Sequence, residues 1–275
     1  MELGILTDTI KRDSIEETLE VINSYGLHYI QLDLTSAGLS TMPEKIEVEM
    51  VKRIKDAAQE NDITISAVSG TFNMSHPDEN VRRAGLERLE SLAVTTKSMG
   101  SSVITLCTGT RDEENMWRWH PDNNTPEAWR DMSDCLRQAL DIAAEHDVIL
   151  AIETEASNVV NTAARCRKIL DQMQSPHLKV IMDAANLFQL NQYDQMQATI
   201  QEGFDLLGEE VVLSHAKDLS AEPGRSFVAA GEGILDYDYY LAQLAQGYDH
   251  IPLIMHGLSE AQIHKSMEFL KQHMI

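Results

Sequence analysis

Four side chains that can bind a metal ion follow four successive, mostly apolar segments in the second half of the chain. They are Glu153 after residues 148–152, Asp183 after 178–182, His215 after 211–213 and His256 after 251–255. Such segments are typical of strands buried on both faces, and a polar residue that follows one must lie at a rim, because an apolar core cannot hold it unpaired. Two carboxylates and two imidazoles suit one divalent ion such as Mn²⁺, Fe²⁺, Co²⁺ or Zn²⁺, with Mg²⁺ as a further candidate. Such an ion is able to polarise a carbonyl or hydroxyl group of a substrate.

A single polar residue after a strand is more often a cap or a loop anchor than a metal ligand. The hypothesis therefore depends on the four positions together. If the strands are consecutive neighbours in one sheet, their carboxyl ends meet on one face, and the four side chains converge there. This joint placement favours a metal site over four unrelated caps.

The whole chain alternates short apolar segments with amphipathic ones, and this alternation predicts a parallel sheet covered by helices. We expect strands at residues 3–6, 29–34, 63–68, 102–107, 148–152, 178–182, 211–213 and 251–255. Helices are expected at about 14–25, 43–61, up to 99, from 126, 162–173, 193–207, 237–246 and from 260 to the C-terminus. Eight such units in 275 residues fit one closed (β/α)8 TIM barrel domain over residues 1–275. An open doubly wound sheet is the alternative, but the glycine-rich first turn typical of that fold is missing at residues 7–10.

Composition restricts the class of protein. The formal net charge of −22 opposes binding to nucleic acid, whose phosphates are also negative. The three cysteines are scattered and suggest neither a disulfide framework nor a thiolate zinc site. The N-terminus enters a strand without a signal-peptide pattern, and no apolar run has the length of a membrane span. We therefore expect a cytoplasmic protein without membrane contact; a homo-oligomer remains open.

Further residues are candidates for contact with a substrate at the same face. Lys217 lies two positions after His215 and so points to the same side of the strand, where it is a candidate catalytic group. The candidates for substrate binding are His76, Arg111, Trp119, His120, Glu155 and Asn186. A structural role is the alternative for several of them, since histidines cap helices and arginines form ion pairs at a rim.

Two loops bear on the substrate. The long segment 108–124 contains Trp117, Trp119 and His120 and is either a lid whose rings stack on a sugar or a loop packed on neighbouring helices. The segment Gly231–Gly233 resembles a phosphate-binding loop, but Glu232 at its centre opposes an anion. We therefore expect a substrate without a phosphate group.

Nearly the whole chain resembles the sugar isomerase and epimerase proteins of the xylose isomerase-like TIM barrel superfamily. The matching motifs are residues 70–78 (GTFNMSHPD), 106–111 (LCTGTR), 182–187 (MDAANL), 215–218 (HAKD) and 231–237 (GEGILDY). The resemblance implies a divalent ion bound by Glu153, Asp183, His215 and a further acid from the last strand. His256 stands where the epimerases of this superfamily have a second glutamate, and Glu260 follows four residues later. This departure leaves metal binding intact and brings the two-glutamate mechanism of proton exchange into question.

The function expected from these observations is metal-dependent isomerisation or epimerisation of a small sugar, polyol or related hydroxy-carbonyl compound. The ion would bind two adjacent substrate oxygens and acidify the intervening C–H group, and Glu153 or a nearby imidazole would move the proton. One alternative is a regulatory barrel that binds metal and sugar without catalysis, consistent with the missing glutamate. Another is an apurinic-site endonuclease, which the acidic composition and Asn186, at a position where a further metal ligand would be needed, both disfavour.

Overall fold

Eight parallel strands form a closed barrel in the computed structural model, which describes residues 1–188, 193–222 and 227–274. The order around the barrel is β1-β10-β7-β6-β5-β4-β3-β2, and β2 pairs with β1 to close it. The strands are β1 (Leu3–Leu6), β2 (Tyr29–Leu32), β3 (Thr64–Ser69), β4 (Val103–Cys107), β5 (Ile149–Glu153), β6 (Leu178–Asp183), β7 (Val211–Ala216) and β10 (Leu253–Met255). The predicted barrel is confirmed, and the open doubly wound alternative is wrong.

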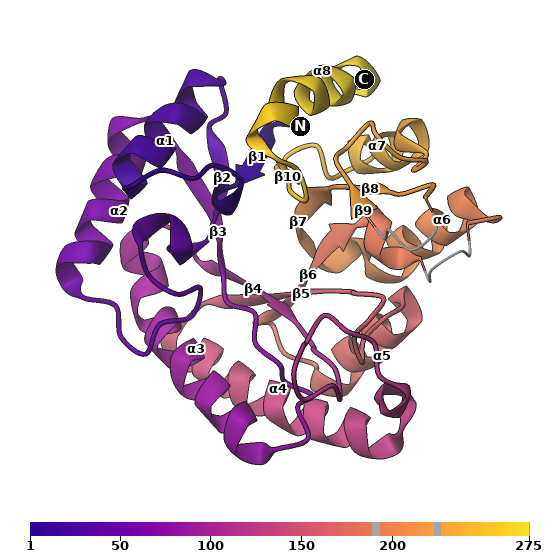
Figure 1. The fold of residues 1–275 in the computed structure, drawn as a ribbon. Helices are drawn as coiled ribbons and strands as arrows, with labels where there is room; N and C mark the ends of the chain where they lie inside the picture. The colour runs from indigo at the N-terminus through magenta and orange to yellow at the C-terminus, as the bar shows by residue number, and fades with distance from the viewer. Residues whose placement is uncertain (189–192, 223–226, 275) are drawn as a thin grey trace.

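In the described part of the chain, eight α-helices form an outer ring around these strands (Figure 1). They are α1 (Ile15–Ser24), α2 (Val48–Glu60), α3 (Glu79–Met99), α4 (Pro126–His146), α5 (Ala163–Met173), α6 (Met196–Leu207), α7 (Tyr237–Ala245) and α8 (Ile263–His273). Side chains cap the N-termini of several helices, as the sequence suggests. Ser14 accepts a hydrogen bond from the backbone of Glu17, and Thr125 and Thr162 cap α4 and α5 in the same way.

Some predicted boundaries are wrong. The second helix begins at Val48 rather than near Pro43, because the segment before it is irregular and buries Met42 and Ile46 in the core. Strand β7 is longer than the predicted 211–213: it continues to Ala216, so His215 lies within the strand and pairs with Asp183 of β6. Longer pairing fixes the backbone of His215 more firmly than a loop would.

The barrel interior is arranged in layers. A small apolar cluster made of Ala67, Ala151, Ile181, Leu213 and Ile254 fills the lumen, with Tyr29 and Val103 packed against it. Gly4 leaves room for this packing, since a Cβ there would come within 2.5 Å of both the Ile254 side chain and the Tyr29 carbonyl oxygen. A second core lies between the barrel and the helices.

A polar layer lies directly above the apolar cluster, because side chains two positions apart on a strand point to the same face. Each of its members follows a residue of the cluster, or one packed against it, by two positions. The layer consists of Gln31, Ser69, Thr105, Glu153, Asp183, His215 and His256, contributed by β2, β3, β4, β5, β6, β7 and the residue after β10. The alternation of the strands thus lifts all four metal-competent residues to one level at the mouth.

A short antiparallel pair follows β7. Strands β8 (Asp218–Leu219) and β9 (Phe227–Val228) form a two-stranded sheet in the segment after Lys217. Among the described residues no helix combines the length and apolar character that crossing a membrane requires.

Candidate metal centre

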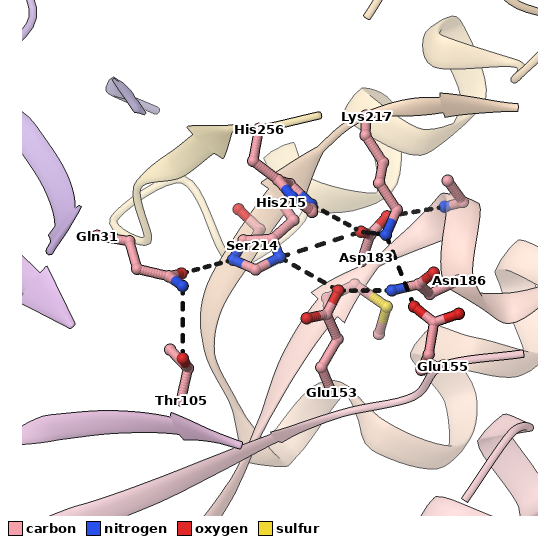
Figure 2. Close-up of polar contacts among 12 residues, drawn as sticks. Gln31, Thr105, Glu153, Glu155, Asp183, Asn186, Ser214, His215, Lys217 and His256 are labelled. Atoms are coloured by element: carbon pink, nitrogen blue, oxygen red, sulfur yellow. Dashed lines mark hydrogen bonds and ion pairs between the residues drawn. The ribbon is translucent and has the colours of Figure 1, made fainter. Parts of the chain in front are cut away.

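Glu153, Asp183, His215 and His256 converge at the barrel mouth. Each offers one ligand atom, and these four atoms lie within 4.8 Å of one another. Figure 2 shows them projecting inward from β5, β6, β7 and the end of β10. The fold thus brings together four side chains that are spread between residues 153 and 256, and their oxygen and nitrogen atoms are donors that divalent transition metals accept.

Asp183 is the centre of the cluster. Its Oδ2 lies 3.2 Å from Lys217 Nζ, 3.2 Å from His256 Nε2 and 4.0 Å from His215 Nδ1. Its Oδ1 accepts the backbone N–H of Ala185 at 3.0 Å. Burial opposes the charge of this carboxylate, but Lys217 and the two histidines outweigh burial and lower its pKa. Asp183 is therefore held as an anion in the interior, which is the state in which a carboxylate is able to bind a metal ion.

Glu153 is oriented by three neighbours. Its Oε1 accepts a hydrogen bond from Asn186 Nδ2 at 2.6 Å and lies 3.2 Å from His215 Nδ1, while Cys107 Sγ donates to Oε2 at 3.9 Å. Burial acts to raise the pKa of Glu153, but its interactions with His215 and Lys217 prevail and lower it. The hydrogen bond from Asn186 leaves the Oδ1 of that side chain buried and without a partner among the described residues.

Both nitrogens of the His215 ring face oxygen acceptors. Nε2 is 2.8 Å from Gln31 Oε1, and Nδ1 is 3.2 Å from Glu153 Oε1. A neutral imidazole has one N–H, so one of these contacts would set two lone pairs against each other. A cation between Nδ1 and the carboxylates removes that conflict, so the residues present fit a bound metal ion. Gln31 was not predicted as a site residue, because a glutamine in a strand has no sequence pattern that distinguishes a site residue from any other.

His256 lies directly after β10, in van der Waals reach of His215, with ring centroids 4.5 Å apart. Burial and the nearby His215 and Lys217 lower its pKa. The neutral form is the one that binds metal, so this environment favours His256 as a ligand. Glu260, the acid that follows four residues later, pairs with Arg12 at 2.6 Å and is not a member of the cluster.

Lys217 and Glu155 border the cluster. The Lys217 ammonium is buried, contacts Asp183, lies 4.0 Å from Glu155 and sits 4.1 Å above the Phe227 ring. Burial disfavours its charge, but Asp183, Glu153 and Glu155 together raise the pKa of Lys217. The pKa of Glu155 is raised by its own burial, with Lys217 opposing that shift.

Two candidates for substrate contact have protein partners instead of a free side chain. The Arg111 guanidinium pairs with Asp131 at 2.8 Å and donates to the carbonyl oxygen of Ser75 at 3.2 Å. His76 Nδ1 accepts the backbone N–H of Asp78 at 3.0 Å, and its Nε2 lies 3.3 Å from the carbonyl oxygen of Glu113. These contacts match the structural alternatives, and a role in substrate binding stays a prediction for both.

The segment 108–124 places its aromatic residues at the surface. Trp117 and Trp119 are each about half exposed, with 53% and 50% of their surface accessible. His120 caps the short 3-10 helix Pro121–Asn124 by accepting the N–H of Asp122. The two ends of the loop are connected, because Asn123 Oδ1 accepts a hydrogen bond from the backbone N–H of Arg111 at 2.7 Å. The exposed rings leave the lid hypothesis standing as a prediction.

Comparison with known proteins agrees with the barrel fold. The model of the xylose isomerase-like TIM barrel family matches residues 19–273. L-ribulose-5-phosphate 3-epimerase UlaE of Escherichia coli O157:H7 (strain EC4115 / EHEC) is 22% identical over 269 residues, which cover 94% of this chain and 89% of that protein. The solved apo structure of the 3-keto-D-glucoside 4-epimerase YcjR from E. coli superposes with a TM-score of 0.75 at 18% identity and covers 99% of both chains.

A further solved structure, the IOLI protein with a bound zinc atom, superposes with a TM-score of 0.74 at 16% identity and covers 99% of this chain and 96% of that one. At such identities the structural matches establish the fold. Together with the family match over most of the sequence, they confirm the resemblance drawn from the motifs. The chain belongs to the xylose isomerase-like TIM barrel family.

Proposed function

We propose that the protein is a divalent-metal-dependent isomerase or epimerase of a small sugar, polyol or related hydroxy-carbonyl compound. The observation that carries the proposal is the convergence of Glu153, Asp183, His215 and His256 at the mouth, where four ligand atoms lie within 4.8 Å. The names of relatives support the class of substrate, since those compared above are a sugar-phosphate epimerase and a ketoglucoside epimerase. A bound divalent ion would supply a Lewis acid that polarises substrate oxygens.

In this proposal Glu153 is the base that transfers the proton. Its Oε1 is held by Asn186, and the interactions with His215 and Lys217 keep the carboxylate ionised and able to accept a proton from carbon. The Oδ1 of Asn186 has no partner among the described residues, and it is an acceptor that a substrate hydroxyl or a water molecule is able to satisfy after a small shift. Asn186 would then connect the substrate to its base.

Lys217 has a different role. Because its pKa is raised, it stays protonated and does not act as a base. Its buried ammonium would donate to a substrate oxygen that gains negative charge during proton transfer, which is the kind of electrostatic stabilisation that is strongest away from water. Glu155 balances this charge and is a candidate to accept a substrate hydroxyl.

A substrate without phosphate is favoured by the loop 231–235. An exposed row of backbone N–H groups in this loop would suit an anion. Here, however, the N–H groups of Gly231, Gly233 and Leu235 all donate to the Asp218 carboxylate, at 3.0, 3.1 and 2.8 Å. The protein's own carboxylate therefore holds the position that a phosphate group would need.

The proposal is tested by solvent exchange at carbon. Protein stripped of metal and reloaded with Mn²⁺ is incubated in D₂O with ketoses, their phosphate esters, inosose-type polyols and hydroxy acids, and deuterium incorporation is followed by NMR. We expect metal-dependent exchange beside a carbonyl group for at least one unphosphorylated compound, and its loss in Glu153→Gln, which keeps the shape of the side chain without a basic oxygen.

A regulatory barrel is the second candidate, because His256 replaces the carboxylate of the two-glutamate mechanism. A compound that binds the Mn²⁺-loaded protein but shows neither exchange nor turnover would favour that function. Exchange that persists unchanged after metal removal would contradict metal dependence.

A further inference from the structure

We infer that Gln31 is a positioning residue that orients His215 so that its Nδ1 faces the metal cluster. The inference rests on the proposed metal site and adds to it a residue from the opposite part of the barrel. Gln31 belongs to β2 and His215 to β7, which are not neighbours in the barrel, so the Gln31 side chain extends across the lumen to meet the ring. Figure 2 shows this contact entering from the side away from the carboxylates.

The Gln31 amide lies with its NH₂ group toward two hydroxyls and its oxygen toward His215. Its Nε2 donates to Ser69 Oγ at 3.1 Å and to Thr105 Oγ1 at 3.4 Å. These hydroxyls lie side by side, because Ser69 and Thr105 are paired in register on β3 and β4. With its NH₂ group directed to two hydroxyls, Gln31 presents only its Oε1 to His215, at 2.8 Å from Nε2. The side chain is 5% exposed, so water offers little competition.

A carbonyl oxygen accepts and does not donate, so it selects the form of His215 in which Nε2 carries the hydrogen. The lone pair of a neutral ring is then on Nδ1, which points to Glu153 Oε1 at 3.2 Å and Asp183 Oδ2 at 4.0 Å. Partners of this kind behind a metal-bound histidine fix the ring and commonly change metal affinity by about 10- to 100-fold. Gln31 thus prepares His215 as an Nδ1 ligand before any ion arrives.

A purely structural role for Gln31 makes different predictions from a positioning role. Gln31→Met keeps the length and bulk of the side chain but offers no carbonyl oxygen, whereas Gln31→Glu keeps an acceptor oxygen at the same distance. The hydroxyls of Ser69 and Thr105 are able to rotate and donate to that carboxylate. Thr96→Val is the matched control, since Thr96 is fully buried and loses a hydrogen bond to Leu92 without contacting the cluster.

The experiment measures Mn²⁺ affinity by calorimetry and the His215 ring by ¹⁵N NMR of the Zn²⁺-loaded protein, with His215→Asn to assign the signals. We expect Gln31→Met to weaken Mn²⁺ binding by about 10- to 100-fold and to lose the protected Nε2–H signal of His215. Gln31→Glu should keep that signal and bind Mn²⁺ at least as tightly as the unmodified protein. Thr96→Val should lower thermal stability and leave both readouts unchanged.

The outcomes separate this inference from the proposed function. If Gln31→Met binds Mn²⁺ as tightly as the unmodified protein, or if Zn²⁺-loaded protein carries its His215 hydrogen on Nδ1, the positioning role is wrong while the metal site stands. If the unmodified protein binds neither Mn²⁺ nor Zn²⁺ at this cluster, the metal site fails, and the positioning role fails with it.

Discussion

The polar layer of the barrel has two arcs of opposite character. One arc, from β5, β6, β7 and the end of β10, carries charged or titratable groups: Glu153, Asp183, His215 and His256. The other, from β2, β3 and β4, carries the neutral groups Gln31, Ser69 and Thr105. All seven occupy the same level above the apolar cluster, so the difference arises from residue type rather than from strand geometry.

This contrast suggests a division of roles between the two arcs of the proposed metal site. The charged arc supplies ligands, but buried carboxylates are stable only with cations or hydrogen bonds nearby. The neutral arc has donors and acceptors that satisfy one another and direct a single oxygen to His215. In the proposed site the charged groups lie where an ion would bind, and the groups that orient them are neutral.

The largest effect of a single change outside the four ligands is expected for Lys217→Met. The variant removes the ammonium that would stabilise negative charge on the substrate, and turnover should fall by about 10²- to 10³-fold. Mn²⁺ affinity should stay the same or rise, because a cation 3.2 Å from Asp183 is lost. Steady-state kinetics and calorimetry measure the two effects separately.

Lys265→Met is the matched control, since Lys265 is largely exposed and pairs with Glu232 away from the cluster. It should leave both quantities unchanged. A Lys217→Met variant with normal turnover would remove this lysine from the mechanism and reduce the charged arc to its four ligands.

Much of the charged arc could be predicted from the sequence, because it repeats one pattern. Apolar segments followed by a metal-competent residue pointed to Glu153, Asp183, His215 and His256, and the alternation of strands and helices predicted the barrel. The neutral arc gave no such signal. Gln31, Ser69 and Thr105 are ordinary strand residues whose meaning depends on contacts over 38 to 184 residues of sequence.

Local conformation limited the prediction elsewhere. The start of α2 depended on burial of Met42 and Ile46, which no capping rule indicates. In the loop after β7, the sequence pointed only to the glycines and to the acidic Glu232 between them. Its organisation around the Asp218 carboxylate, which gathers backbone N–H groups from Gly231, Gly233 and Leu235, is a tertiary feature.

An intermediate effect is expected at His256. His256→Ala should weaken Mn²⁺ binding by about 10-fold or more, because a ligand is lost, whereas His256→Glu should preserve binding at neutral pH. The variants should also differ from the unmodified protein in how strongly their Mn²⁺ affinity depends on pH. Protonation of an imidazole removes its metal-binding lone pair, so affinity falls as pH decreases; the lowered pKa of His256 moves its own contribution to this loss below about pH 6.5.

A glutamate stays ionised to lower pH, with an ordinary pKa of about 4.3. Titrations with Mn²⁺ between about pH 5 and pH 7.5 should therefore show a smaller loss of affinity in His256→Glu than in the unmodified protein. Identical pH dependence and affinity in the unmodified protein and His256→Ala would show that His256 is not a ligand.

The smallest effect is expected at the surface loop. Trp119→Ala should change the free energy of unfolding by less than about 0.5 kcal/mol, because the ring is half exposed. If the loop covers the substrate, KM should rise by up to about tenfold, and ligand binding should alter tryptophan fluorescence. Val94→Ala, an exposed change on α3, is the control. Unchanged KM and fluorescence would favour a packed loop without a role in binding.

The most direct test of the account is the metal content of protein purified without a histidine tag, together with Mn²⁺ titration of Asp183→Ala. Asp183 contacts Lys217, His256 and His215, so the alanine variant lacks a negative charge and a ligand atom at the centre of the cluster. We expect one divalent ion per chain in the unmodified protein and an affinity weakened by about 100-fold or more in the variant. Asp134→Ala, an exposed carboxylate paired with Arg137, should bind normally. Absence of a bound ion from the unmodified protein, or equal affinity in Asp183→Ala, would contradict the metal centre.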